Sequence, residues 1–235
     1  MPGRPGEPRS ALFFTCMLSH FPMLGVVVFL MRRNFRFEGV VGAFAMTVSL
    51  MYHTCECFER SFILPEMRWH RLDNIGAITS VGCSCIQLSC FENRALLDYI
   101  QYVVLFSVII LQEIAPWDLI YTVIPVSLCI SVPIIAHTIN HQRRQRLYLR
   151  RLIMGLLAWG VAIICFILGL DDMNDPARIY HGFFHVFSAV GVFFFFYALR
   201  LSAPRKRKQL YSQHYEDPAV VVVNLREAKV CNQQE

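Results

Sequence analysis

The chain has 235 residues, of which 55% are hydrophobic, 13% aromatic and only 17% charged, and its formal net charge is +5. A soluble domain carries about 25% charged residues, and here the charges lie between long uncharged runs. The composition therefore excludes an ordinary soluble domain. We expect an all-α polytopic membrane protein, folded as a bundle of seven transmembrane helices. In such a protein the net positive charge reflects basic loops that set the orientation in the membrane, and it does not indicate nucleic-acid binding.

Apolar runs of about 20 residues, the length that spans a bilayer core, occur along most of the chain. The seven runs are Ala11–Met31, Phe37–His53, Leu72–Phe91, Leu97–Ile114, Leu119–Ile139, Leu152–Leu170 and Ile179–Leu201. The first is too long for the apolar region of a signal peptide, and no small-residue cleavage site follows it. We therefore expect a short N-terminal tail over residues 1–10, a seven-helix domain over 11–201 and a polar C-terminal tail over 202–235.

Basic residues are unequally divided between the two sides that this arrangement defines. One side, which includes the C-terminal tail, carries 14 of them close to the membrane, and the opposite side carries 6. The positive-inside rule then predicts a lumenal or extracellular N-terminus and a cytosolic C-terminus, in the plasma membrane or an endomembrane. The cytosolic clusters Arg143–Arg146 and Arg205–Lys208 are equally well explained as topology signals and as sites that attract anionic lipid headgroups.

Polar residues gather at the ends of three runs that this topology places in the same, non-cytosolic leaflet. Ser49 and His53 close the second run, Asp73 opens the third, and His181 and His185 open the last. Residues four apart share one face of a helix, so His181 and His185 can point at one place. Ionisable residues inside a membrane are costly and mark functional sites by default. The five side chains are therefore expected to converge at one depth.

Their chemistry predicts a zinc site. His53, His181 and His185 are three ligands that leave the fourth tetrahedral position of zinc open for water, as in catalytic sites. Zinc can lower the pKa of that water to about 7. Asp73 can take its proton as a general base, and Ser49 can hold the water or the developing oxyanion.

Simpler structural roles remain open for each residue. Ser49 can donate to a carbonyl of its own helix, Asp73 can cap the start of a helix, and His53 can be an interfacial histidine. The other two histidines can form a hydrogen-bonded structural pair. His70, in the loop before the third run, can substitute as a ligand, and His20 is expected to be hydrogen-bonded inside the bundle.

The pattern Ser49-x-x-x-His53, Asp73 and His181-x-x-x-His185 on a seven-helix chain resembles the CREST superfamily. This superfamily includes the alkaline ceramidases, the adiponectin and progestin receptors, and the transmembrane protein 8 and myomaker group. The stretch Tyr52-His53-Thr54-Cys55-Glu56 is most similar to the transmembrane protein 8 branch. The resemblance covers residues 11 to 201. It implies zinc ligation by the three histidines, with Asp73 and Ser49 as polar partners of the metal-bound water.

The resemblance also implies a membrane-embedded, zinc-dependent hydrolase that cleaves a lipid amide or ester bond at a lumenal or extracellular site. The alternative is a non-enzymatic protein of the same fold, a receptor or membrane-fusion factor, in which zinc only locks helices together. Asp73 favours chemistry, because a purely structural site needs no base. The sequence leaves open the lipid headgroup, the acyl chain and the oligomeric state.

Overall fold

The computed structural model describes residues 9–171 and 174–200, and this part of the chain is helical with no sheet. The all-α class predicted from the sequence is confirmed for these residues. The predicted C-terminal tail over 202–235, including the cluster Arg205–Lys208, lies outside them. Residues 1–8 of the predicted N-terminal tail also lie outside the described residues.

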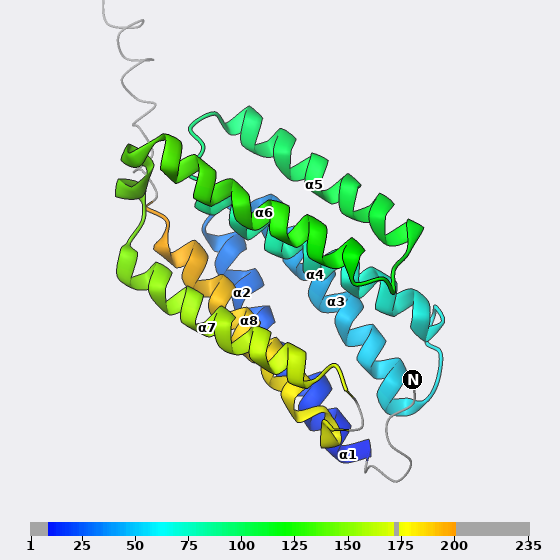
Figure 1. The fold of residues 1–235 in the computed structure, drawn as a ribbon. Coiled ribbons are helices and arrows are strands. Elements are labelled where there is room, and N and C mark those ends of the chain that lie inside the picture. Colours follow the sequence, from blue (N-terminus) through cyan, green and yellow to red (C-terminus); the bar gives the residue numbers. More distant parts are fainter. Residues whose placement is uncertain (1–8, 172–173, 201–235) are drawn as a thin grey trace, which may run out of the picture. The chain divides into compact units, whose positions relative to one another are not determined.

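Helices of 12 to 23 residues follow an irregular N-terminal segment (Figure 1). That segment consists of α1 (Arg9–Leu12), the π-helical turn η1 (Phe13–Met17) and the 3₁₀ turn η2 (Leu18–His20). The longer helices are α2 (Phe21–Arg32), α3 (Arg36–Phe58), α4 (Glu66–Leu88), α5 (Arg94–Ile114), α6 (Ile120–Ile139), α7 (Leu149–Leu168) and α8 (Ile179–Ala198). Two further 3₁₀ turns are η3 (His141–Arg146) and η4 (Pro176–Arg178).

Within the described residues, 5 helical segments are long and apolar enough to cross a membrane. They are Arg9–Arg32, Arg94–Ile114, Ile120–Ile139, Leu149–Leu168 and Pro176–Ala198. Large apolar side chains such as Ile110, Leu128 and Leu157 are more than half exposed on α5, α6 and α7, as expected for helices that face lipid. The chain is therefore a multi-pass integral membrane protein.

The polar helices α3 and α4 pack against each other, and their neighbours cover them (Figure 1). α5 and α6 pack on α4, α2 packs on both α3 and α8, and α7 packs along α8. Four polar side chains of α3 are buried, namely Glu38, Ser49, His53 and Glu56. Because α2 and the N-terminal segment contact both α3 and α8, they link the two helices that carry the predicted histidine ligands.

The ends of α3 and α4 differ from the apolar runs that predicted them. α3 continues past His53 to Phe58, and α4 begins at Glu66, directly after Pro65. Asp73 therefore lies in the third turn of α4, and its predicted alternative role as a helix cap is wrong. The physical reason is that an apolar run marks the part of a helix suited to lipid, while the helix itself continues through polar residues beyond it.

The N-terminal segment lies directly against the start of α8. The Thr15 hydroxyl donates to the backbone oxygen of Ala177, just before α8 begins. Gly182 lies between the histidines of α8, and a Cβ atom at this position would be 2.5 Å from the backbone oxygen of Thr15. Gly182 thus allows two backbones to meet beside the histidine pair.

We expect Gly182→Ala to lower thermal stability, because the added methyl group would collide with a backbone oxygen that no side-chain rotation can move. Overpacking of this kind costs about 1–3 kcal/mol. Gly160→Ala in α7 is the matched control, since a Cβ there has nothing within 4 Å. Thermal unfolding in detergent should show a lower midpoint for Gly182→Ala alone, and equal midpoints for the two variants would contradict the close backbone packing.

Candidate metal centre

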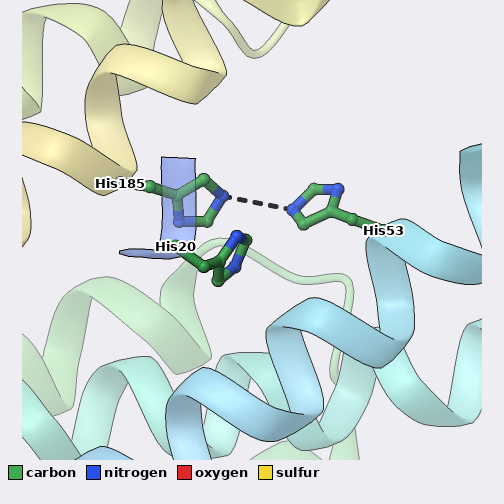
Figure 2. Close-up of side chains that lie close together, drawn as sticks. All are labelled: His20, His53 and His185. Atoms are coloured by element: carbon green, nitrogen blue, oxygen red, sulfur yellow. Dashed lines mark hydrogen bonds between the residues drawn. The ribbon is translucent and has the colours of Figure 1, made fainter. Parts of the chain in front are cut away.

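The three histidines predicted as metal ligands meet in the structure. The Nε2 atom of His53 on α3 lies 3.1 Å from Nε2 of His181 and 3.2 Å from Nε2 of His185. His53 is 0% exposed and His185 is 3% exposed, and Figure 2 shows these two rings facing each other from α3 and α8. Two histidines of α8 therefore present imidazole nitrogens to Nε2 of His53, a residue more than 120 positions earlier in the sequence.

Hydrogen bonds among the imidazoles do not account for this arrangement. Nδ1 of His53 lies 2.8 Å from Oε2 of Glu56, and a carboxylate only accepts, so Nδ1 carries the proton and Nε2 presents a lone pair. One lone pair accepts one well-directed hydrogen bond, yet two imidazole nitrogens approach it. Zinc–nitrogen bonds of 2.0–2.1 Å in a tetrahedron place the ligand nitrogens about 3.3 Å apart. The tautomer of His53 and its two separations, to the nitrogens of His181 and His185, fit a metal ion bound beside Nε2 of His53.

Glu56 and Arg178 hold His53 in this orientation. Oε1 of Glu56 lies 3.4 Å from Nε of Arg178, and both side chains are buried. A histidine that binds a metal commonly donates its other N–H to a carboxylate, which fixes the ring and makes it a better ligand. Because Glu56 lies in the last turn of α3 and Arg178 directly precedes α8, the ion pair also joins these two helices. The sequence reasoning missed both roles, although the three-residue spacing of His53 and Glu56 was a usable signal.

Asp175 fixes the start of α8 and, with it, His181. The carboxylate is 0% exposed and accepts the backbone N–H groups of Tyr180 at 2.9 Å and His181 at 3.1 Å. Helix starts have N–H groups without partners in the helix, and a carboxylate there also interacts favourably with the helix dipole. Ala177 and Arg178, each with φ of 55°, turn the chain so that Asp175 reaches back over the helix. This residue too was missed.

Ser49 and Asp73 lie together one helical turn from His53. Ser49 is buried on α3, and its side chain interacts with the carboxyl group of Asp73 on α4. The geometry falls outside that of a normal hydrogen bond, and the hydroxyl oxygen has no other partner among the described residues. The alternative in which Ser49 donates to its own helix is therefore wrong. Among the described residues, no hydrogen bond joins Asp73 to the imidazoles.

Among the described residues, the structure adds His20 to the cluster and leaves His70 out of it. A ring nitrogen of His20 lies within 4.8 Å of those of His53 and His185, and Figure 2 shows the three side chains together. His70 instead stacks on Tyr52, with ring centroids 4.5 Å apart. The sequence predicted that His20 lies inside the bundle, but nothing in its neighbourhood predicted the site.

Cys16 also lies close to His53. Its sulfur lies within 4.8 Å of a ring nitrogen of His53 and a carboxylate oxygen of Glu56. Cys16 and His20 are four residues apart, so the irregular N-terminal segment supplies both side chains to the site. The candidate centre is therefore built from three parts of the chain: the N-terminal segment, α3 and the start of α8.

Residues 9–186 match the family described as a protein of unknown function, DUF3522. The chain belongs to this family. The matched range begins with α1 and ends within α8, so all the residues of the candidate centre lie inside the DUF3522 region. No curated protein matches the chain.

We expect Asp175→Ala to weaken the start of α8, because two buried backbone N–H groups would lose their acceptor. Loss of a capping carboxylate costs about 0.5–2 kcal/mol. Hydrogen–deuterium exchange of the peptide containing Tyr180 and His181 should become faster, and the thermal midpoint should fall. Asn174→Ala, at the exposed neighbouring position, is the control. If Asp175→Ala exchanged as slowly as this control, the capping role would be wrong.

Proposed function

We propose that this DUF3522 protein is a seven-span membrane hydrolase that uses zinc to cleave an amide or ester bond of a lipid. The observation that carries the proposal is the close approach of Nε2 of His181 and Nε2 of His185 to Nε2 of His53. In this proposal α3 and α4 also cross the membrane, which brings the five apolar segments to seven spans. Each has 23 residues, and they pack against each other and against the more apolar helices.

His53, His181 and His185 would hold the metal through their Nε2 atoms. A zinc ion bound by three histidines supplies a Lewis acid and lowers the pKa of a coordinated water. Glu56 keeps the proton of His53 on Nδ1 and so leaves Nε2 free to bind. Asp175 sets the direction of His181 through its backbone. Both carboxylates therefore serve to position the ligands.

Asp73 and Ser49 supply the polar groups that hydrolysis requires. In this proposal the Asp73 carboxylate accepts a proton from the attacking water as a general base. In this proposal the Ser49 hydroxyl, which lies beside the Asp73 carboxyl group, donates to the oxygen on which negative charge develops. The proposal requires that a lipid reach these residues sideways, between the helices, with its acyl chain still in the bilayer.

In this proposal the site faces the lumen or cell exterior, the orientation that the distribution of basic residues favours. Sealed microsomes expose their cytosolic face, so a tag at Met1 should be protected from added protease, while a tag at Glu235 should be cleaved. The reverse pattern would place the metal centre on the cytosolic side. Anionic lipid headgroups remain proposed partners of the cytosolic cluster Arg143–Arg146.

A non-enzymatic function with a structural zinc ion is the second candidate. The complete burial of His53 and the ion pair between Glu56 and Arg178 favour it, because both tie α3 to α8. In that case the metal would serve a receptor or fusion factor by stabilising the bundle. The hydrolase needs Asp73 as a general base. A zinc ion that only holds α3 and α8 together needs no base.

The zinc site predicts about one zinc per chain after purification in detergent. His53→Ala, His181→Ala and His185→Ala should each lose most of that zinc, because two imidazoles bind far more weakly than three. His70→Ala is the control, since His70 stacks on Tyr52 away from the nitrogen cluster. Elemental analysis measures the content, and full zinc occupancy in all three ligand variants would refute the site.

Asp73→Asn separates the two candidate functions. The amide keeps the size of the side chain but cannot accept the proton, and loss of a general base lowers rates by about 10²–10⁴-fold. Turnover of fluorescent ceramide and phospholipid substrates in mixed micelles should fall by that order, while zinc content stays at one per chain. Asp98→Asn, at a largely exposed ion pair on α5, is the control. Unchanged turnover of a substrate that the wild type cleaves would remove Asp73 from the chemistry, and a wild type that cleaves none would favour the structural role.

A further inference from the structure

We propose that His20 is a fourth imidazole ligand of the metal centre and closes it in the resting protein. The inference rests on the proposed zinc site, but it concerns a residue that the three-histidine pattern does not contain. His20 ends the irregular N-terminal segment at the junction of η2 and α2. Its side chain lies beside His53 and His185 (Figure 2).

The hydrogen bonding of His20 leaves it with the tautomer that a ligand needs. Nδ1 lies 2.7 Å from the backbone oxygen of Cys16, and a carbonyl only accepts, so Nδ1 carries the proton. Nε2 then presents a lone pair. This nitrogen is buried in a residue that is 3% exposed, and it has no hydrogen-bond partner among the described residues. His53 has the same arrangement, with Nδ1 donating and Nε2 directed at the cluster.

The position of His20 is also right for a ligand. Its ring centroid lies 4.2 Å from that of His185 and 5.6 Å from that of His53. Its nitrogen is within 4.8 Å of theirs, whereas ligand nitrogens in a tetrahedral zinc site lie about 3.3 Å apart. A movement of about 1.5 Å, within the reach of a side-chain rotation, would therefore complete the coordination.

The irregular backbone before His20 supports this role. A π-helical turn followed by a 3₁₀ turn changes the face on which the next side chains project, and π turns are frequent at functional sites. The same segment is fixed to α8 through Thr15, which contacts both Ala177 and Gly182. The backbone that carries His20 is thus held against the helix that carries His181 and His185.

Four imidazoles fill a tetrahedral coordination shell, which is the closed arrangement of structural zinc sites. A hydrolase needs one of those positions for water or substrate. In the proposed enzyme, His20 must therefore leave the metal when the lipid binds, and access to the metal becomes a ligand exchange. His20 is in this sense a gating residue of the centre.

X-ray absorption spectroscopy of the zinc-loaded full chain in detergent counts the imidazoles directly. We expect four in the wild type, three in His20→Ala, and four in the control His70→Ala. Azide provides a second test with the cobalt-loaded protein. It should shift the visible absorption of His20→Ala, where a position is open, and leave the wild type unchanged.

Three imidazoles in the wild type, or the same count and azide response with and without His20, would overturn the inference while leaving the three-histidine site intact. A wild type that binds no zinc would instead refute the metal centre itself. The wild-type count alone is decisive if His20→Ala does not fold.

Discussion

The buried ring of His53 is the point on which the rest of the centre depends. One of its nitrogens donates to Glu56, and the other faces His181 and His185 at 3.1 and 3.2 Å. Burying a polar nitrogen without a partner is unfavourable, and His53 is 0% exposed. A metal ion at Nε2 would satisfy the lone pair that its neighbours cannot all share. A metal ion bound there would connect α3 to α8 and, through His20, to the N-terminal segment.

Departures from regular helix lie close to this centre. The N-terminal segment passes through π-helical and 3₁₀ turns before His20, and α8 begins after two residues with left-handed φ angles. Asp175 and Gly182 then adapt the start of α8, the first by accepting two N–H groups and the second by admitting the backbone of Thr15. Such local irregularity is expected where a protein gives up ideal geometry to position functional groups.

Much of the fold could be predicted because apolar runs in a membrane protein must be helical. The predicted run Leu97–Ile114 ends at the same residue as α5, and the last run begins at the same residue as α8. The polar ends were harder to predict, since α4 begins at Glu66 among charged residues that no apolar run includes. The His181 and His185 pair was visible because four-residue spacing places both on one face of a helix.

The remaining parts of the centre depend on tertiary contacts that have no pattern in the sequence. His20 reaches the cluster because of an irregular backbone and close packing, and neither is readable from the residues around it. Asp175 acts across a turn whose conformation is set by Ala177 and Arg178. Glu56 is the exception, because its spacing from His53 allows contact within one helical turn.

The central claim is that His53, His181 and His185 hold a metal ion, and anomalous diffraction from crystals of the full chain tests it most directly. Data collected on either side of the zinc absorption edge should show one strong peak in contact with the Nε2 atoms of all three residues. Well-ordered imidazoles with no anomalous peak between them, in protein purified without chelator and supplied with zinc, would contradict the account.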